Sequence, residues 1–311
     1  MNMISPKLDK NVALIVGPTA SGKSALALEI AKKQPSVIIN ADSAQVYRDL
    51  RILSARPDIE EMEGIEHQLF GYIDGDEACS AARWAGDARA AIAAAHQRDL
   101  MPILVGGTGM YVRVLLDGIA PIPEIDPVIR RAIRKLETLE AYRELETFDP
   151  VSAERLHPTD TTRIQRALEV IRSTGKPLDQ WHRHKSGGIG DKIRLHPLVL
   201  LPPREWLYQR CDLRLHQMIE GGARKEVEIL LSRDLSTDQP VMRAIGVPEI
   251  AAWLAGDLTR EAAIERAQAA TRQYAKRQYT WFRNQCPPDW LRAEKPFNND
   301  FDHIIETILR S

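Results

Sequence analysis

The segment GPTASGKS at 17–24 constrains the fold of this chain more strongly than any other feature. It matches the GxxxxGK[ST] pattern, an apolar run precedes it at 12–16, and an amphipathic stretch follows it at 25–33. This order of strand, glycine-rich loop and helix presents backbone N–H groups at a helix N-terminus, where they bind phosphate. The sequence therefore predicts a phosphate-binding loop inside an α/β fold.

Other apolar runs predict the rest of a sheet. The stretches 36–39, 102–105 and 196–201 are mostly continuous rather than alternating in hydrophobicity, which is typical of parallel strands covered on both faces. An alanine-rich stretch at 83–98 predicts a helix between two of them. We therefore expect an α/β fold with a P-loop NTPase-like parallel sheet flanked by helices, and mainly helical structure from Pro203 onward.

A change of pattern predicts a second domain. Three prolines fall within 121–127, and residues 128–184 show helical spacing with no strand pattern. We predict an all-helical insertion domain at 122–192, within a catalytic core formed by 1–121 and 193–311.

Composition excludes several classes of protein. The 42 lysines and arginines nearly balance the 43 aspartates and glutamates, so the net charge of −1 argues neither for nor against a nucleic-acid partner. Three widely separated cysteines exclude a disulfide scaffold and a CxxC metal site, and they fit a reducing compartment. No apolar run approaches the ~18–20 residues that span a bilayer, and the N-terminus lacks the apolar core of a signal peptide. We expect a cytoplasmic protein with no membrane association, and by default a monomer.

Two residues of the phosphate loop have a predicted chemical role. Lys23 supplies a positive charge for a terminal phosphate, and the Ser24 hydroxyl suits a Mg²⁺ ligand. An ordinary NTPase also carries an aspartate that holds Mg²⁺ after a second strand. The strand predicted at 102–105 ends in glycines instead. The loop thus predicts phosphate binding, but it does not indicate that the ligand is ATP or that it is hydrolysed.

The acid of this site follows the strand at 36–39. Asp42 then lies at the carboxyl edge of the sheet, where open α/β sheets bind ligands. A carboxylate there can be the general base for a nucleophile that attacks the bound phosphate ester; alternatively, Asp42 caps a turn or helix, with Ser43 helping. The turn 106–109 reaches the same edge, where Thr108 either donates its hydroxyl to a ligand or only belongs to a tight turn.

Two basic segments contrast with the balanced overall charge. Residues 266–283 hold five positive charges, no acid and four aromatic side chains, and on a helix Arg272, Lys276 and Arg283 share one face. A second cluster begins at Arg163 in the predicted insertion. Such clustering favours a large polyanion, for example RNA with an unstacked base. The alternative is a solvated helix whose aromatic residues belong to the core.

Six segments, in order and over nearly the whole chain, form a highly specific combination. They are GPTASGKS (17–24), DSAQVYRDL (42–50), VGGTGMYVRVLLDG (105–118), HPTDTTRIQRALEV (157–170), TGKPL (174–178) and TRQYAKRQYTWFR (271–283). Together they resemble the tRNA dimethylallyltransferases.

The resemblance implies a P-loop fold that binds dimethylallyl diphosphate rather than using ATP as the donor. It implies transfer of the prenyl group to the exocyclic N6 of the adenosine just 3′ of the anticodon, forming N6-isopentenyladenosine. Asp42 would take the proton from N6, Thr108 would contact the substrate near N6, and Lys23 with Mg²⁺ would neutralise the diphosphate. The implied phosphate-binding residues are Gly17, Pro18, Thr19, Ala20, Ser21, Gly22, Lys23, Ser24 and Arg214, with Ser24 as the metal ligand.

The same resemblance implies that the anticodon stem-loop of tRNA contacts both predicted domains. The helical insertion corresponds to the domain with which the family grips tRNA. The implied contacts are Asp42, Ser43, Ala44, Gln45, Thr108, Arg130, Thr162, Arg163, Ile164, Gln165, Arg166, Arg243, Arg272, Lys276, Arg277, Gln278 and Arg283.

The chain departs from the family pattern at two places. Where the family usually reads DIGTAKP, residues 51–57 read RILSARP, so Leu53 replaces a glycine. At 246–248, Pro248 removes a backbone donor that could have served RNA.

Three other functions are compatible with parts of the pattern. The first is an isopentenyltransferase that acts on free adenine nucleotides, which has less reason to carry the helical insertion and the basic C-terminal helix. The second is a P-loop small-molecule kinase, in which Asp42 deprotonates a hydroxyl. The third is a non-catalytic RNA-binding protein with a vestigial phosphate loop.

Overall fold

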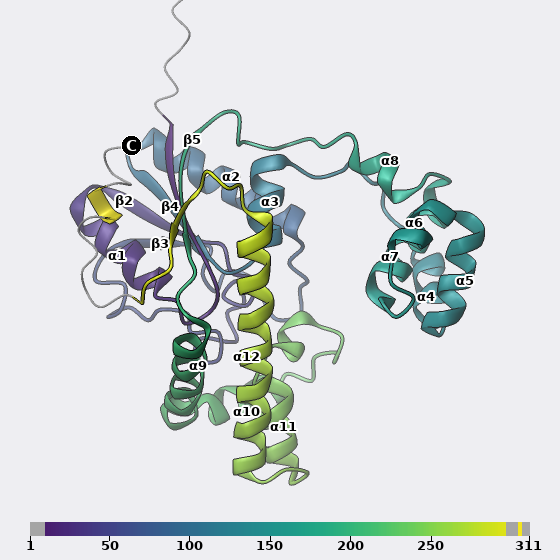
Figure 1. Cartoon of the computed structure of the whole chain (residues 1–311). Helices are drawn as coiled ribbons and strands as arrows, with labels where there is room; N and C mark the ends of the chain where they lie inside the picture. Colours follow the sequence, from purple (N-terminus) through teal and green to yellow (C-terminus); the bar gives the residue numbers. More distant parts are fainter. Residues whose placement is uncertain (1–9, 297–303, 307–311) are drawn as a thin grey trace, which may run out of the picture. The chain divides into compact units, whose positions relative to one another are not determined.

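The computed structural model describes residues 10–296 and 304–306. The chain forms two compact units, which we call the helical unit (Leu116–Gly188) and the core unit (Met1–Leu115 with Ile189–Ser311) (Figure 1). The helical unit begins and ends a few residues earlier than the insertion predicted at 122–192.

Within the described residues, the core unit contains a six-stranded sheet in the order β3-β2-β4-β1-β5-β6, and all neighbouring strands are parallel. The predicted parallel α/β core is therefore confirmed. The sequence does not predict the two edge strands, because each has only three residues and neither is continuously apolar. The strands are β1 (Asn11–Val16), β2 (Ser36–Asn40), β3 (Glu66–Gln68), β4 (Met101–Gly106), β5 (Arg194–Leu200) and β6 (Leu291–Ala293).

Strand β1 shows why the apolar runs are continuous. It lies between β4 and β5, and all its side chains from Val12 to Val16 are fully buried. Ala13 and Ile15 pack in one cluster with Leu26 and Ile30 of α1. Because helices cover both faces of the sheet, neither face of this strand can carry polar residues. The strand delivers the phosphate loop at its carboxyl end.

The helices of the core unit include those predicted at 25–33 and 83–98. No helix in the described part of the chain is long and apolar enough to cross a membrane. The helices are α1 (Lys23–Lys33), α2 (Ala81–Gln97), α3 (Gly109–Asp117), α9 (Arg204–Met218), α10 (Arg224–Leu231), α11 (Val247–Ala255) and α12 (Arg260–Gln285).

Helix α12 brings the C-terminal part of the chain to the carboxyl edge of the sheet. It has 26 residues, packs against α9 and α11, and is capped by Thr259, whose hydroxyl accepts a hydrogen bond from the backbone N of Ala262 at 3.1 Å (Figure 1). At Gly109, a Cβ atom would lie 2.3 Å from the ring of Trp281, so only glycine allows α12 to lie this close to the start of α3. The middle of α12 therefore lies beside the loops that follow β1, β2 and β4.

The helical unit has its own hydrophobic core. Ile133, Leu145, Ile164 and Leu168 are fully buried in one cluster. Three of its helices begin at aspartate caps, which are Asp126, Asp149 and Asp160. The carboxylate of Asp160, for example, accepts a hydrogen bond from the backbone N of Arg163. The helices are α4 (Pro127–Arg134), α5 (Thr138–Phe148), α6 (Pro150–Arg155), α7 (Thr161–Thr174) and α8 (Leu178–His182).

Candidate active site

The phosphate loop connects β1 to α1 with the backbone that an anion site needs. Gly17 has a φ of +154°, and a Cβ there would lie 2.4 Å from the carbonyl oxygen of Leu200. Gly22 begins α1 in the left-handed conformation, and no side chain caps the helix. The first turn also contains no acid. No side chain of the helix itself therefore neutralises the positive end of its dipole or accepts from its first N–H groups.

Lys23 extends along this loop, and its Nζ atom donates to the carbonyl oxygen of Pro18 at 2.6 Å. Burial lowers the pKa of Lys23 to about 8, because the charged form loses its hydration. The negative charge of Asp42 opposes this shift, while Arg214 adds to it. A nearby phosphate would stabilise the charged form of this lysine and raise its pKa again.

Two arginines of α9 face the phosphate loop. Arg214 donates from Nη2 to the Thr19 hydroxyl, and Arg210 donates from Nε to the carbonyl oxygen of Ala20 at 3.1 Å. Burial lowers the pKa of Arg214, and the charge of Asp42 partly compensates. Arg214 was predicted from the sequence, whereas Arg210 was not. Their i, i+4 spacing, which places both on one face of a helix, could have revealed Arg210.

Around the loop, two buried polar atoms have no partner in the described residues: the Ser21 hydroxyl oxygen and Nε of Arg214 on α9. Such atoms are rare, because each one loses its hydration and gains no hydrogen bond in return. Both belong to residues that line one cavity of about 450 Å³. A phosphate-bearing ligand in this cavity would supply the missing acceptors.

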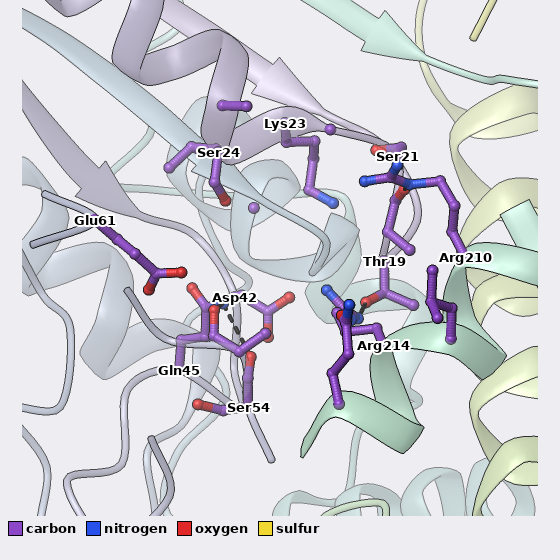
Figure 2. Close-up of a pocket in the computed structure, with 18 residues that line it drawn as sticks. Thr19, Ser21, Lys23, Ser24, Asp42, Gln45, Ser54, Glu61, Arg210 and Arg214 are labelled. Atoms are coloured by element: carbon purple, nitrogen blue, oxygen red, sulfur yellow. Dashed lines mark hydrogen bonds between the residues drawn. The ribbon is translucent and has the colours of Figure 1, made fainter. Parts of the chain in front are cut away.

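Figure 2 shows this first cavity, which we call the phosphate cavity. Lys23, Arg214 and the phosphate loop bound one side, while Asp42, Gln45 and Ser54 bound the other. A second cavity of about 380 Å³, which we call the acceptor cavity, is lined by Asp42, Ser43, Ala44, Tyr47, Leu53, Ser54, Arg243, Tyr274 and Arg277, among others. The two cavities share Thr19, Asp42, Ser54 and Arg214. A group bound in one can thus meet a group bound in the other beside Asp42.

Asp42 follows β2 in a turn that uses half of its carboxylate. Its Oδ1 accepts from the backbone N of Ala44 at 3.0 Å, and its own backbone N donates to Asn40 Oδ1 at 2.8 Å. The capping role considered from the sequence is therefore present. Its Oδ2 accepts no hydrogen bond from the described residues and lies near Gly107, where a Cβ would come within 3.1 Å of it. One carboxylate oxygen orients the turn, and the other remains available for a proton.

Thr108 fastens the glycine turn to the Asp42 turn. Its hydroxyl oxygen accepts from the backbone N of Ser43 at 2.9 Å, and its proton goes to the Ser43 hydroxyl at 3.1 Å. The tight turn considered from the sequence is thus present. In this arrangement Thr108 holds Ser43, the residue that follows Asp42.

Gln278 has a different place from its predicted tRNA contact. Its side chain is buried, Oε1 accepts from the backbone N of Thr19 at 2.8 Å, and Nε2 donates to the carbonyl oxygen of Gly107 at 2.9 Å. Both ends of the amide are therefore occupied inside the protein. Gln278 ties the phosphate loop to the glycine turn. The sequence could not indicate this, because both partners are more than 150 residues away.

The other predicted tRNA contacts divide into buried, paired and exposed side chains. Ile164 is fully buried in the core of the helical unit, so its side chain cannot contact RNA as predicted. Arg272 is held by both carboxylate oxygens of Asp212, at 2.7 and 2.8 Å. Its partner lies on another helix, so the charge pattern of α12 alone did not show it. Exposed side chains remain at Thr162, Arg163, Arg243, Lys276, Arg277 and Arg283, of which Arg163 and Arg243 also form ion pairs with Asp160 and Asp238.

Three arginines of the helical unit surround one buried carboxylate. Glu169 contacts Arg134 at 3.1 Å, Arg166 at 3.5 Å and Arg130 at 3.8 Å. Three positive charges meet one negative charge, so the cluster remains net positive and its guanidinium groups are held in place. Arg130 and Arg166 were predicted as tRNA contacts, whereas Arg134 was not.

The phosphate cavity also fits a Mg²⁺ ion accompanied by phosphate. Ser24, an exposed residue, lines it with a hydroxyl oxygen. The described residues contain no group of three or more histidine, cysteine, aspartate or glutamate side chains that could hold a metal. This donor set suits Mg²⁺, which usually takes one or two protein oxygens and completes its shell with phosphate oxygens and water.

Comparisons with known proteins identify the family of this chain. The family model described as IPP transferase matches residues 45–285, and the model described as isopentenyl transferase matches residues 10–77. The chain belongs to the tRNA dimethylallyltransferase family. A tRNA dimethylallyltransferase of Erythrobacter litoralis is 60% identical over 302 residues, covering 96% of this chain and 94% of the relative. One of Novosphingobium aromaticivorans is 62% identical over 278 residues, covering 89% and 98%.

A solved structure of the family extends the similarity to three dimensions. A eukaryotic dimethylallyltransferase acting on tRNA has a TM-score of 0.81 and 30% identity, covering 94% of this chain and 75% of that chain. The predicted family and fold are therefore confirmed.

Proposed function

We propose that this protein transfers a dimethylallyl group from dimethylallyl diphosphate to N6 of the adenosine just 3′ of the anticodon in tRNA, forming N6-isopentenyladenosine. The observation that carries the proposal is the pair of cavities that share Asp42 and Arg214. The phosphate loop bounds one, and basic and aromatic residues of α12 bound the other. The names of the similar enzymes support the same donor group and the same substrate class.

The phosphate cavity receives the diphosphate of the donor. Its N–H groups, Lys23 and Arg214 balance the negative charge, and the free Ser21 hydroxyl gains an acceptor. Ser24 would hold Mg²⁺, which when bound neutralises charge on the diphosphate as it leaves. These groups do for an allylic diphosphate what a P-loop does for a nucleotide, and they require no ATP.

Asp42 lies where the two bound substrates would meet. The N6 nitrogen attacks the allylic carbon, a C–N bond forms, and the C–O bond to the diphosphate breaks. The leaving diphosphate takes the electron pair, and Asp42 Oδ2 takes the proton from N6. The hydrogen bonds from the Ala44 backbone and the Asn40 side chain hold Asp42 in place for this transfer.

The acceptor cavity receives the adenine. Tyr274 and Tyr47 line it with aromatic rings, and Arg277 lies 5.7 Å from the ring centroid of Tyr274. Burial raises the pKa of Tyr274, and the charge of Asp42 adds to this effect, so its hydroxyl stays protonated and can donate. Taking a base out of the anticodon stack costs a few kcal/mol, which stacking and phosphate contacts can offset.

The helical unit adds a second positively charged region that can contact an anion. Besides the arginines around Glu169, it has a pocket lined by Lys176, Trp181, Arg183 and His184, in which Lys176 Nζ lies 5.5 Å from the Trp181 ring centroid. The described residues that line this pocket include no acid. A ring with adjacent cations suits a nucleotide and its phosphate.

The lowered pKa of Lys23 predicts that the affinity for dimethylallyl diphosphate depends on pH. Its pKa of about 8 means that the free protein carries this charge below pH 8 and loses it above. Binding a diphosphate raises that pKa, so above pH 8 binding must take up a proton. We expect the affinity for dimethylallyl diphosphate, measured by calorimetry between pH 7.5 and 9.5, to fall by up to about tenfold per pH unit above pH 8. In Lys23→Met the affinity should be lower and nearly independent of pH; a slope equal to that of the wild type contradicts the assignment.

The exposed positive charges of α12 predict that their removal changes how tRNA affinity depends on salt. Replacing Lys276 and Arg283 by glutamine should reduce the slope of log K for tRNA against log salt by roughly one for each phosphate that no longer meets a positive charge. Arg272→Gln is the matched control, because Asp212 already neutralises Arg272 and the slope should hardly change. Fluorescence titrations at several salt concentrations measure both. An unchanged slope in the double variant removes this face from the RNA site.

One assay tests the proposed function itself. Labelled dimethylallyl diphosphate is incubated with Mg²⁺ and unmodified tRNA, AMP or ATP. We expect label in tRNA, and none when the adenosine next to the anticodon is replaced. Residues 10–77 also match a model described as isopentenyl transferase, and prenyl transfer to free adenine nucleotides is the second candidate. Label only in AMP or ATP supports that candidate, and ATP turnover without label supports a kinase.

A further inference from the structure

Residues 51–55, which we call the wall segment, separate the two cavities. Leu53 and Ser54 line the acceptor cavity, while Ser54 and Ala55 line the phosphate cavity. The segment forms a hydrogen-bonded turn outside any helix, in which the backbone N of Ala55 donates to the carbonyl oxygen of Ile52 at 2.9 Å. A single turn has few internal hydrogen bonds, so its position depends on contacts from other elements.

Glu226 on α10 supplies one of these contacts. Its Oε1 accepts from the backbone N of Arg51 at 2.6 Å and of Ile52 at 2.8 Å, and its Oε2 accepts from the backbone N of Leu53 at 2.9 Å. Within the described residues, these three backbone N–H groups have no other hydrogen-bond partner. Hydrogen bonds to a carboxylate are about twice as strong as neutral ones. One side chain, more than 170 residues away in sequence, thus holds three consecutive residues.

The opposite end of the wall segment is held from inside the site. Gln45 Nε2 donates to the carbonyl oxygens of Ser54 at 3.0 Å and Ala55 at 2.9 Å (Figure 2). Gln45 lines the phosphate cavity only three residues after Asp42. The segment is therefore fixed at its N–H groups by Glu226 and at its carbonyl groups by Gln45.

Leu53 leaves the wall segment little room to move, because its side chain packs closely against Gly246. A Cβ atom at Gly246 would lie 2.7 Å from Leu53 Cδ2, so the leucine side chain already fills the space against this glycine. Leu53 stands where the resembled family has a glycine. A shift of the segment would move a bulky side chain within the acceptor cavity, whereas a glycine there would change little.

We propose that Glu226 is a positioning residue for prenyl transfer, which sets the passage between the two cavities through the backbone of the wall segment. This inference rests on the proposed function. Glu226 lines neither cavity, so its role would be exercised through the wall segment and not by contact with a substrate. Because Ser54 belongs to both cavities, release of the segment affects both substrates rather than one. If Glu226 only stabilises the fold, its loss changes the melting temperature and leaves the kinetic constants unchanged.

The test compares Glu226→Ala and Glu226→Gln with Glu228→Ala. Glu228 lies on the same helix, is exposed and pairs with Lys225 at 2.8 Å, so it is a matched control. We expect Glu226→Ala to raise KM for both dimethylallyl diphosphate and tRNA by about tenfold, which is modest for a misplaced site wall. Glu226→Gln keeps acceptor oxygen for two of the three N–H groups and should lie between. Glu228→Ala should stay within about twofold of the wild type, as is usual for an exposed ion pair.

Two further measurements complete the test. Combining Glu226→Ala with Gln45→Ala should give less than the product of the single effects, because both act on one segment. Calorimetry with inorganic diphosphate tests the phosphate cavity without tRNA: we expect weaker binding in both Glu226 variants. A wild type that does not label tRNA speaks against the proposed function, while this binding still tests Glu226. Glu226 variants with a lowered melting temperature but diphosphate affinity and kinetics equal to Glu228→Ala overturn the inference.

Discussion

Replacing Asp42 by asparagine should lower kcat for prenyl transfer to tRNA by about 10²-fold or more. The amide cannot take the proton from N6, so the nucleophile stays protonated during attack. The side-chain oxygen of asparagine can still accept the hydrogen bond from Ala44, so the turn keeps its shape. The measurement is single-turnover transfer of label, which separates chemistry from binding and product release.

Asp42→Ala is the companion variant, because it removes both the proton acceptor and the cap. The affinity of Asp42→Asn for tRNA, measured in parallel, should stay within about twofold of the wild type, since a general base acts mainly in the transition state. If asparagine restores near-normal kcat while alanine does not, Asp42 is a structural cap and the base must be sought elsewhere. The two substitutions therefore separate the two roles that the structure allows for this carboxylate.

The sequence predicted those parts of the fold that local patterns determine. Continuous apolar runs predicted the four longer strands, and the phosphate loop placed β1 and α1 correctly. The strands β3 and β6 could not be predicted, because three residues with mixed polarity carry no periodic signal. Their hydrogen bonds come from neighbours far away in the chain, so tertiary context creates them.

The same limit applies to the candidate site. Lys23, Asp42 and Arg214 were predicted, since motif and resemblance identify them, and the structure brings all three to one cavity. The resemblance implied that Gln278 contacts tRNA, yet its amide connects two loops inside the protein. Glu226 carries no motif at all; its role depends on where α10 packs. Charge and polarity in one segment cannot show which partner another segment supplies.

The second large effect on catalysis is expected from replacing Arg214. Replacing it by glutamine should lower kcat/KM for dimethylallyl diphosphate by about 10²-fold, the usual loss when one preorganised donor to a developing anion is removed. Its guanidinium is buried between the phosphate loop and Asp42, and Nε has no partner in the described residues. A charge shielded from water in this way interacts strongly with an anion, because little water screens it. The diphosphate gains charge as the C–O bond breaks, so the effect should appear in kcat as well as in KM.

Arg210→Gln is the matched control for this prediction. Arg210 lines the same cavity from the same helix but is exposed, and water screens its charge, so we expect less than about a tenfold loss. Steady-state kinetics with dimethylallyl diphosphate as the varied substrate compares the two variants, and a melting curve checks that each is folded. Equal losses for both arginines would mean that the site attracts the diphosphate through its overall charge. A loss confined to Arg214 would mean that one buried guanidinium stabilises the leaving group, next to the carboxylate that takes the proton.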